Sequence, residues 1–200
     1  MVQAPSQPLL LQLPDEIALQ VTREQFAALV AANRDLRLER TATGHLIVNP
    51  PTGGEIGHRN LSITGQLSVW FEANDTLGKA FDSSTGFALP NGANRSPDAS
   101  WVRKERWEAL TPEQREGFVP LCPDFVVELR SKTDSLKDLR EKMQEYMENG
   151  SQLGWLIDPK NKRVEIYRPG QVVEILENPR KLSGEKILPG FVLTLKRILN

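Results

Sequence analysis

The sequence has little of what marks a secreted or membrane-bound protein. Its 200 residues include one cysteine, Cys122, so an internal disulfide is excluded and a reducing compartment is expected. No apolar run approaches the ~20 residues that a membrane-spanning helix needs. The first residues lack the basic and then apolar pattern of a secretion signal. We therefore expect a cytoplasmic protein.

The chain also lacks an excess of charge of either sign. It has 25 basic and 26 acidic residues, a net charge of −1, so any basic surface for nucleic acid must be local. The sequence contains no helix-turn-helix or zinc-finger pattern. A small-molecule hydrolase with carboxylate chemistry has little support, because no nucleophile motif such as G-x-S-x-G is present.

The remaining composition is that of a globular domain. Apolar residues make up 39% and charged residues 26% of the chain, and 200 residues suit one domain with a sizeable core. Residues 1–14 hold three prolines and three glutamines among apolar residues. We expect an N-terminal arm over residues 1–20 and a single domain over residues 21–200.

A strand–helix–strand unit over residues 123–158 is the clearest pattern in the chain. The β-branched and aromatic residues 125–127 predict a buried strand. Leu136, Leu139, Met143 and Met147 recur at helical spacing, and Gly150 is a helix stop. A second apolar strand at 153–157 follows. Short links make this a βαβ unit, so its two strands are expected to be parallel.

The other elements complete an α/β (α+β) fold. The expectation is a mixed β-sheet flanked by helices, with an antiparallel meander near the C-terminus. The predicted helices are 22–33, 55–74 and one that starts at Thr111; the predicted strands are 36–39, 46–48, 80–81, 87–89, 99–102, 164–167 and 172–176, with a last strand or helix edge at 191–195.

Two acidic residues adjoin predicted core strands. Asp98 follows Pro97 and opens one strand, whereas Glu128 closes another. Two carboxylates on neighbouring strands can share a hard divalent cation, with water and phosphate oxygens as further ligands. Each residue also has a structural interpretation: Asp98 as a turn or cap residue, and Glu128 in an ion pair with Arg130 or Lys142.

Four segments together resemble a known family. They are SPDASWV at 96–102, PDFVVELRS at 123–131, KDLREKMQEYMENG at 137–150 and LGWLIDP at 153–159. In order and spacing they resemble the PD-(D/E)XK nuclease superfamily, and within it the Uma-two-type restriction endonucleases, over roughly residues 20–195. This resemblance implies a restriction-endonuclease-like fold, an endonuclease site that uses Mg²⁺ or Mn²⁺, DNA as substrate, and a homodimer.

The resemblance also implies roles for individual residues. Asp98 and Glu128 match the two metal carboxylates, and Glu55 resembles an extra acidic ligand on the superfamily's first helix. Arg130 occupies the position expected for the catalytic lysine, although an arginine cannot act as a neutral base. Lys142, on the following helix, is the candidate to replace that lysine. Taken alone, Lys142 is typical of a solvated helix face and Glu55 of a helix start.

Two hypotheses follow. The first is a Mg²⁺-dependent endonuclease in which Asp98 and Glu128 hold the ion and Lys142 or Arg130 activates water or stabilises the phosphate. The second is a catalytically inactive nuclease-fold module for nucleic-acid binding or assembly. Arg130 and the slightly acidic net charge favour the second.

Overall fold

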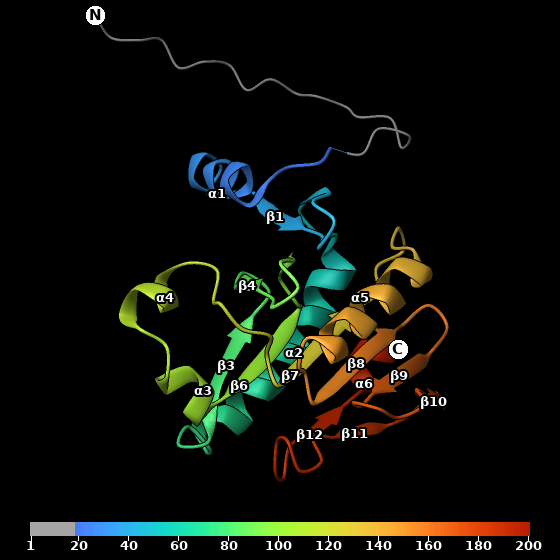
Figure 1. The fold of residues 1–200 in the computed structure, drawn as a ribbon. Coiled ribbons are helices and arrows are strands. Elements are labelled where there is room, and N and C mark those ends of the chain that lie inside the picture. Colours follow the sequence, from blue (N-terminus) through green and yellow to red (C-terminus); the bar gives the residue numbers. More distant parts are fainter. Residues whose placement is uncertain (1–18) are drawn as a thin grey trace, which may run out of the picture.

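A computed structural model describes residues 19–200 (Figure 1). The arm expected over residues 1–20 lies almost wholly outside the described residues. The helices are α1 (Arg23–Ala32), α2 (Gly54–Glu72), α3 (Lys104–Glu108), α4 (Pro112–Glu116), α5 (Leu136–Glu148) and α6 (Lys196–Leu199). None of these helices has the length and apolar character needed to cross a membrane.

The strands form three sheets. The strands are β1 (Arg37–Arg40), β2 (Leu46–Asn49), β3 (Gly78–Asp82), β4 (Phe87–Ala88), β5 (Asn94–Arg95), β6 (Ala99–Arg103), β7 (Phe125–Leu129), β8 (Leu153–Asp158), β9 (Arg163–Tyr167), β10 (Glu174–Glu177), β11 (Lys181–Ser183) and β12 (Val192–Thr194). Six strands form the central sheet, in the order β10-β9-β8-β7-β6-β3. A second sheet has the order β2-β1-β5-β4, and β11 pairs with β12.

The predicted βαβ unit is the centre of the molecule. β7 and β8 are parallel, with Phe125 opposite Leu153, and α5 makes the crossover between them. All other pairs in the central sheet are antiparallel, so the sheet is mixed, as expected from the sequence. Ser135 caps α5 by accepting a hydrogen bond from the backbone N–H of Asp138. Gly150, at φ 106°, lies just beyond its C-terminal end.

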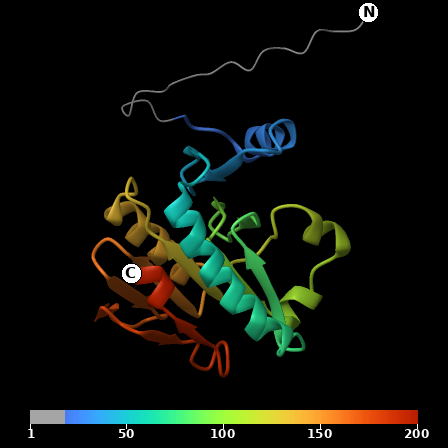
Figure 2. The ribbon, with the colours of Figure 1, turned by 180° about the vertical axis from the view of Figure 1, so that it is seen from behind.

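Strand alternation divides the core between the two faces of the central sheet. Phe125 and Val127 point to one face, where α2 and the C-terminal segment from β11 to α6 cover them. Val126 lies on the opposite face and packs with Met143 and Tyr146 of α5. Figures 1 and 2 show α2 and α5 on opposite sides of the sheet. Glu128 follows the alternation of Val126, so it faces α5.

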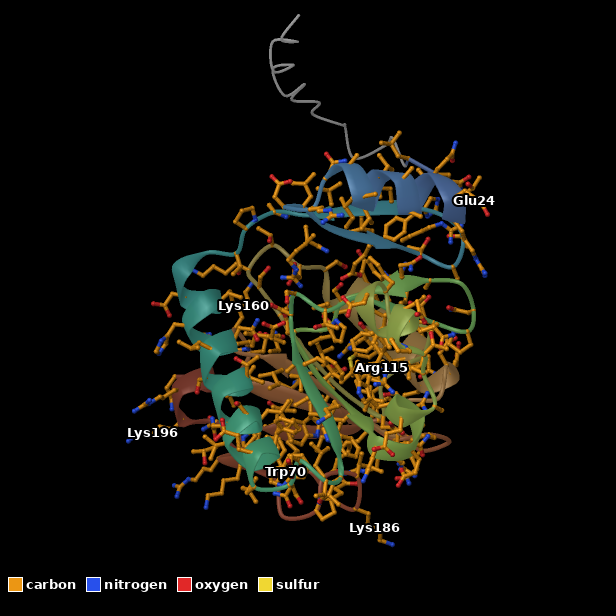
Figure 3. The ribbon with its side chains drawn as sticks, turned by 90° about the vertical axis from the view of Figure 1, so that its left-hand side faces the viewer. Glu24, Trp70, Arg115, Lys160, Lys186 and Lys196 are labelled. Atoms are coloured by element: carbon orange, nitrogen blue, oxygen red, sulfur yellow. The ribbon has the colours of Figure 1, made fainter. Side chains whose placement is uncertain are left out.

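The second sheet and α1 form a layer at one end of the central sheet (Figure 3). β1 and β2 are an antiparallel hairpin that turns at Gly44, φ 94°. β5 pairs with β1 through Arg40 and Asn94. The chain then needs only residues 96–98 to pass from β5 into β6 of the central sheet. This connection brings Asp98 to the junction of the two sheets.

The structure differs from the expected elements at a few places. The strand predicted at 172–176 is β10, Glu174–Glu177, and the segment 191–195 holds β12 and ends at Leu195, the residue that caps α6. The sequence did not predict β5, β11 or α3, because elements of two to five residues show no measurable periodicity.

Candidate functional site

Asp98, which directly precedes β6, lies near Glu128 of β7. The register of β6 and β7 ends with Ala99 opposite Val127, and the backbone N–H of Asp98 donates to the carbonyl of Val127 at 3.0 Å. The negative charge of Asp98 is close enough to raise the pKa of Glu128. The backbone N–H of Leu129 donates to Oδ2 of Asp98 at 2.8 Å, which fixes that carboxylate at the strand end.

Helix α5 brings a lysine and a tyrosine onto the same carboxylate. Lys142 and Tyr146 are four residues apart and so lie on one side of the helix. Nζ of Lys142 is 2.9 Å from Oε1 of Glu128, and the hydroxyl of Tyr146 donates to the same oxygen at 2.9 Å. Lys142 is therefore not on a solvated face. Glu128 is only 4% exposed, and both side chains that bind its carboxylate belong to α5.

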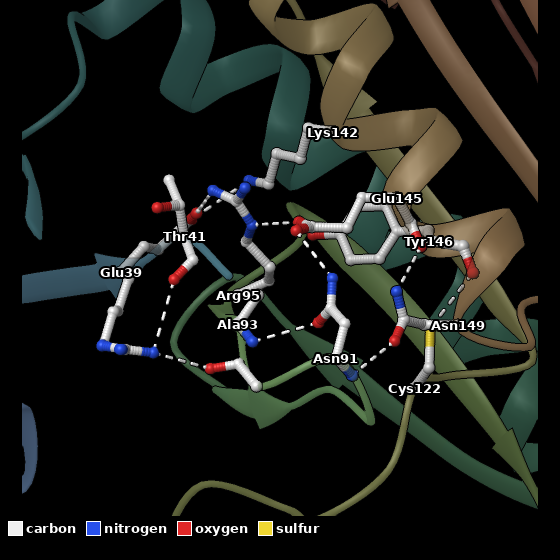
Figure 4. Close-up of polar contacts among 12 residues, drawn as sticks. Glu39, Thr41, Asn91, Ala93, Arg95, Cys122, Lys142, Glu145, Tyr146 and Asn149 are labelled. Carbon is white, nitrogen blue, oxygen red and sulfur yellow. Dashed lines mark hydrogen bonds and ion pairs between the residues drawn. The ribbon is translucent and has the colours of Figure 1, made fainter. Parts of the chain in front are cut away.

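A third carboxylate, Glu39 of β1, belongs to the same cluster. Its Oε1 accepts from Nζ of Lys142 at 3.0 Å and from the backbone N–H of Ser96 at 3.3 Å. Its Oε2 is 3.3 Å from Nη1 of Arg95 (Figure 4). Lys142 thus bridges Glu39 and Glu128, which come from two different sheets. Sequence analysis missed Glu39.

Arg95 extends this network to the far end of α5. Its Nε donates to Oε2 of Glu145 at 2.6 Å, and the side-chain amide of Asn91 donates to Oε1 of Glu145 at 3.0 Å (Figure 4). The backbone N–H of Asn91 also donates to Oδ1 of Asn149 at 2.8 Å. The loop before β5 is therefore held to α5 by several polar contacts, and the cluster is rigidly placed.

The pKa values of the three carboxyl groups in the cluster are shifted from their ordinary values. Burial raises the pKa of Glu128 to about 7, with repulsion from Asp98 and Glu39 adding to it and Lys142 opposing it. Burial also raises the pKa of Asp98. Burial acts in the same direction on Glu39, but the charges of Lys142 and Arg95 outweigh it and hold the pKa of Glu39 below its usual value.

The pKa of Lys142 is also set by two opposing effects, burial and nearby charge. Burial favours its neutral form, but the carboxylates of Glu128 and Glu39 outweigh burial and raise the pKa of Lys142 above its usual value. The ammonium group is therefore charged at neutral pH. Such a lysine can stabilise negative charge on a phosphate, whereas it cannot take up a proton from water.

Arg130 does not take the place of the superfamily's lysine. Its Nη1 donates to Oδ2 of Asp158 at 2.7 Å, and its Nε donates to the carbonyl of Asp134 at 3.3 Å. Asp158 ends β8, the parallel neighbour of β7, so this ion pair ties two strand ends and the loop before α5 together. Among residues 19–200, the side-chain polar contacts of Arg130 go to Asp158 and Asp134 and not to Asp98, Glu128 or Lys142.

Glu55 also lies outside the cluster. It is in the first turn of α2, before the part of the helix that packs on the sheet through Ile63, Leu67 and Trp70. Its side chain is 82% exposed and 3.7 Å from Arg59. No described contact joins Glu55 to Asp98, Glu128 or Lys142, whereas Glu39 accepts a hydrogen bond from Lys142 at 3.0 Å.

The donor set fits a hydrated divalent cation. Among residues 19–200, no three or more histidine, cysteine or acidic side chains are grouped closely enough to form a metal site by themselves. Asp98 and Glu128 remain as a pair of hard oxygen donors beside a concentration of negative charge. Mg²⁺ is commonly bound by one or two carboxylates together with water and substrate phosphates. The pair is thus suited to an ion that keeps water ligands and meets its substrate.

The mixed sheet, the βαβ unit and the acids at its strand ends define a restriction-endonuclease-like α/β protein. Comparison with protein families gives a match over residues 23–196 to the Uma2 family, described as "putative restriction endonuclease", and the chain belongs to this family. The fold is similar to a crystal structure described as a "putative nuclease belonging to DUF820" from Anabaena variabilis, with a TM-score of 0.73 and 21% identity. That match covers 90% of this chain and 97% of the other. No curated protein matches.

Proposed function

We propose that the protein is a metal-dependent endonuclease that hydrolyses phosphodiester bonds in DNA. One observation carries the proposal: the backbone N–H of Leu129, the residue after Glu128, holds Oδ2 of Asp98 at 2.8 Å, and the buried ammonium group of Lys142 is 2.9 Å from Glu128. Membership of the Uma2 family supports the same activity.

In this proposal each residue has a distinct role. Asp98 and Glu128 would hold Mg²⁺ or Mn²⁺, which when bound polarises a phosphodiester and lowers the pKa of a water molecule. Lys142, charged at neutral pH, stabilises the negative charge that develops on the phosphate. Glu39 and Tyr146 orient Lys142 and Glu128 through hydrogen bonds of 3.0 and 2.9 Å.

Substitution of the two carboxylates tests the proposal. We expect Asp98→Asn and Glu128→Gln each to reduce Mg²⁺-dependent nicking of supercoiled plasmid by at least about 100-fold, the effect of losing one electrostatic contribution to the transition state. Glu141→Gln is the matched control, because Glu141 is an exposed acid on α5 whose ion pair is with Lys137. Plasmid nicking by both site variants at the wild-type rate would overturn the proposal.

A second candidate function is a nuclease-fold module that binds nucleic acid without cutting it. The observation that favours it is the burial of Glu128, which is 4% exposed and whose Oε1 is already bound by Lys142 and Tyr146. Calorimetry with Mn²⁺ separates the two functions. A binding heat that is lost in Asp98→Asn supports the endonuclease, whereas no binding heat in the wild-type protein supports the inactive module.

We further propose that the protein acts in the cytoplasm as a homodimer, with residues 21–200 as one domain. The single cysteine supports a reducing compartment, and the family resemblance supports a dimer. Sedimentation equilibrium measures the dimer directly, and a monomer at micromolar concentration would contradict it.

A further inference from the structure

A cavity of about 850 Å³ lies between the N-terminal layer and the chain around β4 and α4. Its walls come from α1, the start of β1, the segment from Gly86 to Leu89, and residues 116–118. Ser96 also lines it, and the backbone N–H of Ser96 donates to Glu39 at 3.3 Å. The cavity is therefore directly adjacent to the acidic cluster.

The lining of this cavity is rich in arginine. Arg23, Arg34 and Arg37 all contribute to it. Within residues 19–200, none of the three has an ion pair with a carboxylate. The acidic side chains of the lining, Asp35 and Glu116, are exposed, as are Arg23 and Arg34, whereas Arg37 is half-buried. Three arginines against two acids give the lining a positive balance of charge, which suits an anionic ligand.

Of the three arginines that line the cavity, Arg37 is the one whose charge acts on the acidic cluster. It is half-buried on β1, two residues before Glu39, and its Nε is buried without a hydrogen-bond partner among the described residues. Its positive charge also acts on Asp98, where burial raises the pKa and Arg37 and Lys142 oppose that shift. A buried guanidinium N–H without an acceptor is unfavourable, and a phosphate oxygen is an acceptor that it prefers.

The same cavity contains an aromatic ring in a fixed position. Phe118 is half-buried and packs edge-on against Phe26, with ring centroids 5.4 Å apart. Behind it lies Gly86, where a Cβ atom would be 2.4 Å from the ring. A side chain at residue 86 would therefore displace Phe118. Rings held in this way are platforms on which single-stranded bases stack.

The volume of the cavity limits its occupant. Pockets of roughly 300–1,000 Å³ take small-molecule ligands, and 850 Å³ is within that range. This space suits one or two unstacked nucleotides and excludes a double helix. Apolar walls from Val30 and Leu36 suit a base, while the arginines suit its phosphate.

We propose that this cavity binds an unpaired nucleotide of a single-stranded DNA segment, with its base against Phe118 and its phosphate at Arg37, beside the acidic cluster. The inference rests on the proposed function for its substrate class. It adds a preference: the protein binds DNA that carries a single-stranded overhang more tightly than blunt duplex.

Fluorescence anisotropy in EDTA tests this preference without cleavage. The probes are a labelled blunt duplex, the same duplex with a four-thymidine overhang, and the overhang made of RNA. We expect the full chain to bind the DNA overhang at least about fivefold more tightly than the blunt duplex, the contribution of one base–aromatic stack. Phe118→Ala and Arg37→Gln are expected to remove the difference.

Controls separate this proposal from folding and from catalysis. Arg197→Gln removes one exposed arginine from α6 and should keep the overhang preference; its neighbour Lys196 lies well away from Glu24 of α1 (Figure 3). Arg37→Lys retains the charge and tests whether Arg37→Gln acts through folding. Asp98→Asn should keep the preference even if cleavage is lost. Equal affinity for blunt and overhang duplexes, or tighter binding of the RNA overhang, would overturn the proposal.

Discussion

At the scale of single residues, Lys142 decides the character of the site. Its ammonium group is 3.0 Å from Glu39 and 2.9 Å from Glu128, and Arg95 also pairs with Glu39, so two cations face the three acids Glu39, Glu128 and Asp98. Asp98 is close by, and burial keeps its pKa raised. A buried cluster with more acids than cations is poorly satisfied on its own. The excess of acids in this cluster favours the binding of a further cation.

Arg130 and Asp158 give a residue-scale prediction with a defined pH dependence. Burial raises the pKa of Asp158, but hydrogen bonds from Arg130 and Asn161 outweigh it and hold the pKa below the ordinary value of 3.8. A carboxyl with a lowered folded-state pKa stabilises the protein above the unfolded pKa. That stability is lost as pH falls through the folded pKa.

We therefore expect Arg130→Gln to lower the free energy of unfolding at pH 7 by about 1.5–3 kcal/mol, the range for a hydrogen bond to a charged group. The difference from the wild-type protein should shrink as pH falls below 3.8. Urea unfolding followed by circular dichroism at several pH values measures this. A difference that grows as the pH falls would contradict the assignment, and Mg²⁺-dependent nicking should survive the substitution.

At the scale of elements, the third acid of the site comes from β1 and not from α2. Glu39 is 3% exposed and bonded to Lys142, whereas the side chain of Glu55 is 82% exposed. We expect Glu39→Gln to reduce plasmid nicking by about tenfold or more, because Lys142 loses a partner that orients it. Glu55→Gln is the matched control and should nick at the wild-type rate.

Thermal melts of Glu39→Gln and Glu55→Gln show whether a loss of nicking comes from a misplaced Lys142 or from unfolding of the protein. If the nicking rate of Glu39→Gln falls only by the fraction of that variant that is unfolded, Glu39 has a purely structural role. Loss of nicking in Glu55→Gln, with Glu39→Gln active, would restore the acid of α2 to the site.

The same elements show how far the sequence could predict the structure. The βαβ unit was predictable because residues 125–127 are a continuous β-branched and aromatic run and the apolar residues of α5 recur at helical spacing; these elements also carry Glu128 and Lys142. Glu39 could not be found in this way. It lies in the strand Arg37–Arg40, of sequence RLER, where three of four residues are charged and nothing local marks one as buried. Its role depends on β5 and α5, which contact it from distant parts of the chain.

Arg130 illustrates a different limit. The family pattern places the lysine at its position, and the sequence shows only that an arginine is there. Its partner Asp158 is on a parallel strand, and their contact at 2.7 Å depends on the register of β7 and β8. Side-chain pairing across a parallel sheet is set by tertiary structure, so the local sequence could not assign it.

At the scale of the whole molecule, the two hydrophobic clusters share the central sheet. Val126 and Val127 are neighbours in β7 but belong to opposite clusters. Neither cluster can lose its packing without disturbing the strand that supports the other. We therefore expect a fragment of residues 21–200 to fold alone and to unfold in one cooperative transition, with coincident circular dichroism and tryptophan fluorescence curves.

The control for this prediction is the full chain under the same conditions. A fragment that fails to fold, or one that shows two separate transitions, would contradict a single domain over residues 21–200.

The span of the site along the chain has a consequence for biosynthesis. Glu39, Asp98, Glu128 and Lys142 meet only when β1, the central sheet and α5 are all in place. A growing polypeptide that has left the ribosome as far as residue 128 still lacks the lysine and the helix that carries it. The cluster of Glu39, Asp98, Glu128 and Lys142 is therefore incomplete until α5 has been translated and has packed on the central sheet.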